Sequence, residues 1–184
     1  MEDHETLISV EALSAELGSP ALQIVDCRFN LLQPEAGRQA YEQAHIPGAA
    51  YAHLDDDLAG PVTAASGRHP LPDVDAIAAF FGNIGIDPTI QVVVYDDMSG
   101  AIAARAWWLL RWLGHRRVAV LNGGFARWQA QGLATTSGTE TAAARDFMAV
   151  PQPGLVIETA EVVAAVDGGA DLQLVDARDA VRFR

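Results

Sequence analysis

Two patterns of apolar and polar residues alternate along the chain, continuous apolar runs and amphipathic stretches with helical spacing. Short apolar runs at residues 22–25, 91–95 and 118–121 have the length of buried strands, and amphipathic stretches separate them. This succession predicts an α/β fold, because parallel strands need helical crossovers to connect them. We therefore expect a mostly parallel sheet with helices on both faces.

Three amphipathic stretches have recognisable ends. Asp73 can cap a helix whose apolar residues recur at spacings of three and four, and residues 101–113 and 125–131 predict two further helices. The apolar face of the first helix comprises Ile77, Phe80, Phe81 and Ile84. A glycine, the residue that most readily ends a helix, follows each predicted helix, at Gly85, Gly114 and Gly132.

One seven-residue segment occurs twice. Leu-Gln-Ile-Val-Asp-Cys-Arg at residues 22–28 recurs 150 positions later as Leu-Gln-Leu-Val-Asp-Ala-Arg, and both copies follow a helix-like stretch. A spacing of this size indicates the duplication of a whole domain. The predicted organisation is a complete first domain at residues 1–133, a linker at 134–154 rich in Thr, Ala, Gly and Pro, and the beginning of a second, truncated domain at 155–184.

Composition excludes several classes of function. The chain has 184 residues and a formal net charge of −12, without a Lys/Arg run, so nucleic acid is not an expected partner. The most apolar stretch, residues 101–113, contains two arginines and is too short to span a membrane. The acidic first residues do not resemble a secretion signal, and a single cysteine suits a reducing compartment, so we expect a cytoplasmic protein.

The loop at residues 96–100 is the expected ligand site. It follows the apolar run 91–95 and precedes a helix, and ligands of α/β proteins bind where helix N-termini meet the carboxyl ends of strands. Several further motifs stand in a fixed order along the chain: the turn His45-Ile46-Pro47-Gly48-Ala49, Val92 to Asp96, Ala104-Arg105-Ala106-Trp107-Trp108, Gly114-His115, Leu121-Asn122-Gly123-Gly124-Phe125 and Trp128. Through these motifs the chain resembles the tandem rhodanese family, the thiosulfate and 3-mercaptopyruvate sulfurtransferases.

The resemblance implies a chemistry that this chain cannot perform alone. Active rhodanese domains carry a cysteine right after this strand, whose thiolate takes a sulfur atom from a small anionic donor, thiosulfate or 3-mercaptopyruvate. The persulfide then passes the sulfur to cyanide or a thiol, and no cofactor is needed. Asp96 occupies the cysteine position here. We therefore expect no catalytic residue in this chain, a nucleophile in the missing remainder of the second domain, and packing of that remainder on the first domain.

The repeat separates structural from functional residues. Cys27, the only thiol, aligns with Ala177, so we interpret it as a small buried side chain and not as a nucleophile. Two Asp-x-Arg pairs recur and predict structural ion pairs: Asp26 with Arg28, and Asp176 with Arg178. Arg182 has no arginine opposite it in the first copy, where Leu32 or Ala40 aligns. By resemblance it matches the substrate-binding arginine of tandem enzymes, and a guanidinium suits sulfonate or carboxylate.

Other conspicuous residues favour structural roles. His45 lies in a turn and is expected to order its loop. His53 with the acidic residues 55–57 fits no dedicated metal pattern, so no metal site is expected. Three tryptophans on one predicted helix are expected in the core or at a domain interface: Trp107, Trp108 and Trp112.

Two alternatives to a sulfurtransferase are considered. The first is a non-catalytic rhodanese module that binds or scaffolds a partner. The second is a phosphatase, because certain cell-cycle phosphatases share the fold. The phosphatase is set aside, because it needs a cysteine and a longer loop ending in arginine, and neither follows Tyr95.

Overall fold

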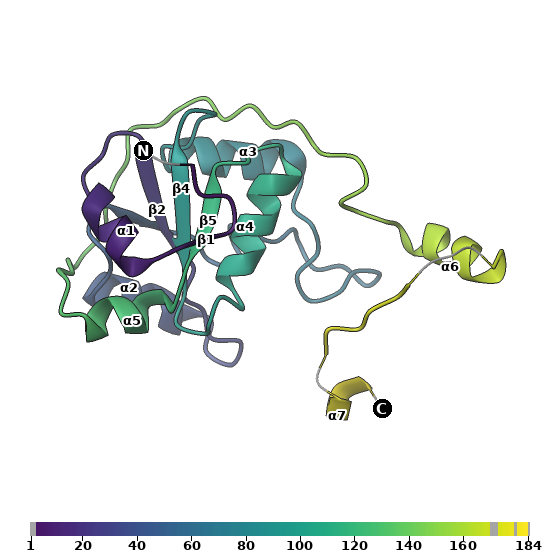
Figure 1. Ribbon diagram of the computed structural model, residues 1–184. Coiled ribbons are helices and arrows are strands. Elements are labelled where there is room, and N and C mark those ends of the chain that lie inside the picture. The colour runs from purple at the N-terminus through teal and green to yellow at the C-terminus, as the bar shows by residue number, and fades with distance from the viewer. Residues whose placement is uncertain (1–2, 170–172, 179, 184) are drawn as a thin grey trace. The chain divides into compact units, whose positions relative to one another are not determined.

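The computed structural model describes residues 3–169, 173–178 and 180–183. The chain divides into two compact units, Met1–Gln152 and Pro153–Arg184, and each is described by itself. The first unit contains every strand among the described residues and the helices that cover them (Figure 1).

A parallel five-stranded sheet forms the centre of the first unit. Its spatial order is β1 (Leu7–Ile8), β5 (Val118–Leu121), β4 (Gln91–Tyr95), β2 (Leu22–Asp26) and β3 (Ala49–Tyr51). The three predicted strands, β2, β4 and β5, lie together in the middle, where every position of β4 is buried. The two edge strands, β1 and β3, are short, and their sequences gave no strand prediction.

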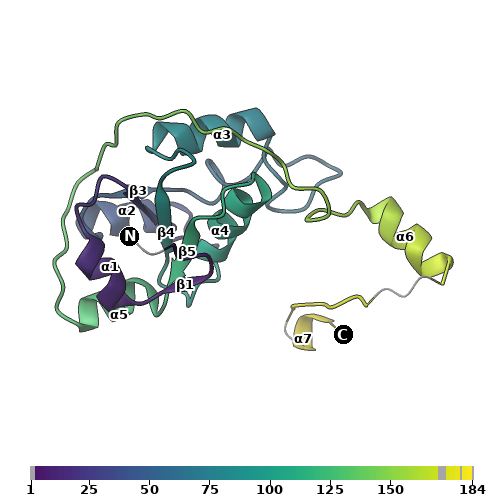
Figure 2. The same cartoon turned by 45° about the horizontal axis from the view of Figure 1, so that its top comes forward.

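Helices cover both faces of the sheet, which confirms the predicted fold class. Val25, Val92 and Val94 pack in one core with α3 (Val74–Asn83) and α4 (Ala103–Trp112). The alternate strand positions, including Ile24 and Val93, pack in a second core with α1 (Val10–Glu16) and α5 (Gly124–Ala130). Figures 1 and 2 show α1 and α5 on one side, with α2 (Glu35–Gln43) near them, and α3 and α4 on the other.

The ends of the helices follow from the sequence with one exception. The Asp73 carboxylate accepts hydrogen bonds from the backbone N–H groups of Asp75 and Ala76, and α3 ends just before Gly85, whose φ of 86° lies in the left-handed region. Helix α4 begins two residues later than its apolar pattern predicts, at Ala103. The preceding residues instead form the loop that surrounds Asp96.

Residues 134–152, which the sequence predicts as part of a linker, pack along the first unit. The side chain of Phe147 is buried in the core beside Phe81 of α3, with ring centroids 5.4 Å apart. The backbone of Arg145 donates to the Gly82 carbonyl, and that of Val150 donates to the Leu113 carbonyl. One buried phenylalanine and scattered backbone hydrogen bonds attach this segment, without any repeating pattern that composition could reveal.

The second unit contains the helix that the repeat predicts, but the predicted strand is not formed at residues 173–177. Helix α6 (Thr159–Asp167) starts with a capping box in which Glu158 and Glu161 satisfy each other's backbone N–H groups. Residues 173–177 do not form a strand, and a short helix α7 (Ala180–Phe183) follows. In the described part of the chain, no helix is long and apolar enough to cross a membrane.

Candidate functional site

Two neighbouring strands bring the candidate site together. Strands β2 and β4 run parallel with Asp26 paired to Tyr95, so both chains leave the sheet at the same edge. Residues 27–30 follow β2 and residues 96–100 follow β4. The sequence motifs on these two segments, 65 or more residues apart along the chain, therefore meet at one carboxyl edge.

The carboxylate of Asp96 fills the loop that follows β4. Its Oδ1 accepts backbone hydrogen bonds from Met98 at 2.9 Å and Gly100 at 2.8 Å, and its Oδ2 accepts from Ile102 and Ala103, both at 2.8 Å. The residue is only 1% exposed. Four N–H donors thus converge on one buried anion, two of them from the beginning of α4.

This loop depends on an unusual backbone conformation. Ser99 has φ 58°, and it is the one non-glycine residue in the left-handed region within the described ranges. Gly100 follows with φ 88°. The N–H groups on either side of Ser99, those of Met98 and Gly100, both donate to Asp96, so the cost of the conformation is offset by these hydrogen bonds.

The loop is therefore an anion-binding site that the carboxylate of Asp96 already occupies. A carboxylate carries no transferable sulfur, and it uses the donors that would otherwise stabilise a thiolate or a bound oxyanion. That Asp96 stands where active copies have their cysteine remains a prediction from the resemblance.

A buried network lies beneath the same edge. Arg28 donates from Nε and Nη2 to both carboxylate oxygens of Asp26, at 2.6 to 3.1 Å, and its guanidinium lies 4.1 Å above the ring of Phe125. The Tyr95 hydroxyl donates to Asp26 Oδ2 at 2.7 Å and accepts from the Ile46 N–H. The predicted Asp26–Arg28 ion pair is thus present and buried, with two of the guanidinium nitrogens hydrogen-bonded to the carboxylate.

The network shifts two pKa values. Burial opposes the charge of Arg28, but the hydrogen bonds and charge of Asp26, with smaller contributions from Tyr95 and Asp97, outweigh it and raise the pKa of Arg28. Burial, the charge of Asp26 and the hydrogen bond to it raise the pKa of Tyr95 well above its usual value. Arg28 therefore stays charged and Tyr95 stays neutral.

Cys27 lies in the core and not at the surface. Its side chain is fully buried among apolar residues on the α3 and α4 side of the sheet. Burial, followed by the charges of Asp26, Asp96 and Asp57, raises the pKa of its thiol well above the usual value. A neutral, inaccessible thiol is a poor nucleophile.

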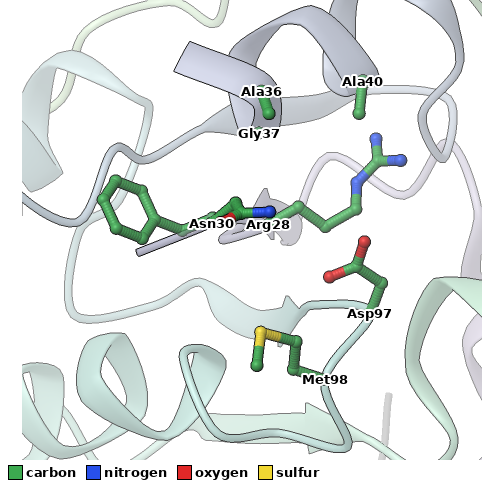
Figure 3. A pocket seen from close by; sticks show the side chains of 8 residues that line it. Arg28, Asn30, Ala36, Gly37, Ala40, Asp97 and Met98 are labelled. Carbon is green, nitrogen blue, oxygen red and sulfur yellow. The ribbon is translucent and has the colours of Figure 1, made fainter. Parts of the chain in front are cut away.

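A pocket of about 250 Å³ opens beside the Asp96 loop (Figure 3). Arg28 and Asn30 line it from the chain after β2, and Asp97 and Met98 line it from the loop after β4. Small residues of α2, Ala36 and Ala40 among them, leave the space open. Asp97 and Met98 belong to the loop that the sequence predicts as the ligand site, whereas sequence reasoning missed Asn30, although its position shortly after a strand could have indicated it.

The remaining candidate residues lie outside this pocket. The ring of His45 stacks on Tyr41, 4.0 Å between centroids, and its Nδ1 lies 2.7 Å from the Tyr41 carbonyl. His53 contacts its own loop through Asp56 and Asp57. Among the described residues, no group of His, Cys, Asp and Glu could hold a metal. Trp108 and Trp112 stack on each other, 5.8 Å apart, partly buried against the core.

The second Asp-x-Arg pair repeats the first. Arg178 donates from its backbone N–H, Nε and Nη2 to Asp176 in the same pattern as Arg28 to Asp26, but both side chains are exposed. Arg182 lies in α7, and its side chain is outside the described part of the structure. Its role as a substrate contact stays a prediction.

Comparisons with known proteins identify the family that this chain resembles. The sequence model of the rhodanese-like domain matches residues 9–131. The chain is 46% identical over 180 residues to a probable 3-mercaptopyruvate sulfurtransferase of Pseudomonas aeruginosa, covering 97% of this chain and 63% of that protein. It is 35% identical over 181 residues to the human 3-mercaptopyruvate sulfurtransferase, covering 95% of this chain and 58% of that protein.

A solved structure is similar to this chain in sequence and in fold. The crystal structure of SseA from Escherichia coli, described as a 3-mercaptopyruvate sulfotransferase with the rhodanese fold, superposes with a TM-score of 0.88 at 29% identity. The match covers 98% of this chain and 68% of SseA. The chain thus spans less than two thirds of the length of the curated relatives named above.

Proposed function

Because the chain belongs to the rhodanese-like family, we propose that it forms the front domain and the opening of the second domain of a sulfurtransferase. The donor would be 3-mercaptopyruvate or thiosulfate, the acceptor cyanide or a thiol. The observation that carries this proposal is the filled loop: four amides surround Asp96 where a reactive sulfur would be needed. Such a front domain requires a nucleophile elsewhere.

The proposed reaction takes place in two balanced steps. A thiolate in the equivalent loop of the second domain attacks the outer sulfur of the donor, a new S–S bond forms, and pyruvate enolate or sulfite leaves with the electron pair. Cyanide or an acceptor thiolate then attacks the outer persulfide sulfur, and the original thiolate is released. Neither step needs a cofactor.

Residues present in this chain would support that reaction in different ways. Arg182 would bind the anionic end of the donor, since the resemblance aligns it with a substrate-binding arginine. The Asp26–Arg28 and Asp176–Arg178 pairs would have the structural role of fixing the chain after the first strand of each domain. The missing part of the second domain would pack on the first, in a cytoplasmic protein.

A non-catalytic binding module is the second candidate. It is favoured by one observation, that the only thiol of the chain, Cys27, is buried and has a raised pKa. In that case the chain would bind a partner and transfer no sulfur.

Thiocyanate formation from each donor and cyanide separates these candidates. The chain 1–184 is expected to show no turnover above its Cys27→Ser variant. The protein translated from the continued reading frame is expected to turn over, and to lose that activity when the cysteine of its second loop is changed to serine. Turnover by the chain 1–184 that disappears in Cys27→Ser would overturn the assignment. A longer protein without such a cysteine would favour the binding module.

A further inference from the structure

The pocket beside the Asp96 loop carries two opposite charges that do not meet. Figure 3 shows the side chain of Asp97 directed toward that of Arg28, whose guanidinium is turned toward Ala40, and no ion pair within 4.0 Å joins the two charges among the described residues. The charge of Asp97 nevertheless contributes to the raised pKa of Arg28. A cation and an anion therefore face the same space from the two strand ends.

One nitrogen of the Arg28 guanidinium is free to donate hydrogen bonds. Nε and Nη2 of Arg28 are occupied by Asp26 and the Ala44 carbonyl, whereas Nη1 makes no hydrogen bond to any described residue. The Arg28 side chain is only 6% exposed and is fixed by Asp26 on one side and by the Phe125 ring on the other. It therefore offers N–H groups in a fixed direction at little further entropic cost.

The carboxylate of Asp97 is likewise free to bind a ligand. Asp97 is exposed and has no hydrogen bond or ion pair in the described part of the structure. It differs from its neighbour Asp96, whose carboxylate is fully used inside the loop. The four backbone amides that surround Asp96 are consequently closed to ligands, and the side chains of Arg28 and Asp97 remain to recognise one.

The rest of the pocket is small and mixed in character. Met98, Phe29 and Ala40 provide apolar surface, and Asn30 provides an amide. A volume of about 250 Å³ lies below the usual range of pockets for drug-sized molecules and suits a much smaller ligand.

We propose that this pocket binds a small zwitterionic α-amino acid. The α-carboxylate contacts Nη1 of Arg28, the α-ammonium contacts Asp97, and a short apolar side chain lies along Met98 and Phe29. The ligand completes the interrupted charge pair, which neither a simple anion nor a simple amine does. This binding site is separate from the sulfur-transfer chemistry proposed above, so either proposal can fail alone.

The test is an amide NMR titration of the chain 1–184 at constant ionic strength. The probes are L-2-aminobutyrate and its two truncated analogues, n-propylamine, which lacks the carboxylate, and butyrate, which lacks the ammonium. We expect saturable shifts for L-2-aminobutyrate at the amides of residues 28–30, 97 and 98, with each analogue binding at least about twofold more weakly.

Three variants sharpen the result. Asp97→Asn should weaken L-2-aminobutyrate binding by about two- to fivefold and leave butyrate binding unchanged or improved. Asp146→Asn, an exposed carboxylate that does not line the pocket, is the matched control and should change neither. Ala40→Leu should fill the space and abolish binding. Shifts that do not saturate, butyrate binding as tightly as the amino acid, or equal effects of Asp97→Asn and Asp146→Asn would overturn the proposal.

Discussion

The α-carbon of Gly124 lies directly against the backbone of Asp96. A Cβ atom added at Gly124 would be 2.2 Å from the Asp96 carbonyl oxygen, which accepts the N–H of Phe125 at 2.9 Å. The beginning of α5 is thereby fixed to the loop after β4. The Gly-Gly-Phe motif thus supports the Asp96 loop through backbone contacts. The sequence does not reveal this role, because the motif lies far from residue 96 along the chain.

Gly124→Ala should therefore destabilise the first unit strongly. The left-handed φ of 56° and the close carbonyl together should reduce the free energy of unfolding by about 2–5 kcal/mol. Gly132→Ala is the matched control, because its φ of 67° is similar but a Cβ there meets nothing within 4 Å. It should cost about 1 kcal/mol. Equal losses in urea unfolding of the two variants would show that the contact with Asp96 is unimportant.

The Asp96 loop should activate a sulfur atom placed in it. In a Cys27→Ala background, Asp96→Cys should give a thiol whose pKa lies below the usual value of about 8.5, because four amides favour the thiolate. Absorbance at 240 nm against pH measures this. Asp97→Cys in the same background places a thiol one residue away, outside the ring of amides, and should titrate near the usual value. Coincident titrations would contradict the assigned role of the loop.

The Tyr95 hydroxyl should contribute to stability through both of its hydrogen bonds. Tyr95→Phe leaves the Ile46 N–H without an acceptor and removes one donor from Asp26, so we expect a loss of about 1–3 kcal/mol in the free energy of unfolding. Tyr51→Phe removes a single bond to the Arg28 carbonyl from a half-buried residue and should cost about 1 kcal/mol or less. Urea denaturation of both variants makes the comparison, and a Tyr95→Phe variant as stable as the parent would refute it.

Acid should break the ion pair between Arg145 and Asp87, which attaches residues 134–152 to the rest of the first unit. Hydrogen bonds from Thr89, followed by that from Arg145, lower the pKa of Asp87 from 3.8 to about 2. A folded-state pKa below the unfolded value gives stability that is present above about pH 4 and lost as pH falls toward 2. The difference in unfolding free energy between the parent and Asp87→Asn should accordingly be largest near pH 6 and shrink by pH 2.5. A difference independent of pH would count against this assignment.

Much of the fold could be predicted because its signals are local. The buried strands β2, β4 and β5 are continuous apolar runs, and Asp73 and Gly85 mark the ends of α3 through hydrogen bonds and backbone freedom within a few residues. The edge strands β1 and β3 are too short to carry a period, and their pairing depends on neighbours distant in the sequence. The packing of residues 134–152 is not evident from the sequence for the same reason, since it depends on the insertion of Phe147 into a core built by distant residues.

The two Asp-x-Arg pairs show most clearly what the sequence determines and what the tertiary structure decides. Arg28 and Arg178 make the same fork to an aspartate two residues before them, so the sequence by itself determines this geometry through contacts of very short range. Only the tertiary structure decides what the fork becomes. In the first unit the side chains of Arg28 and Asp26 are 6% and 0% exposed, because a sheet, Tyr95 and Phe125 enclose them, whereas those of Arg178 and Asp176 are 52% and 30% exposed. Likewise, Asp96 and its four amide donors lie within one short loop of the sequence, but only the fold brings Gly124 against that loop.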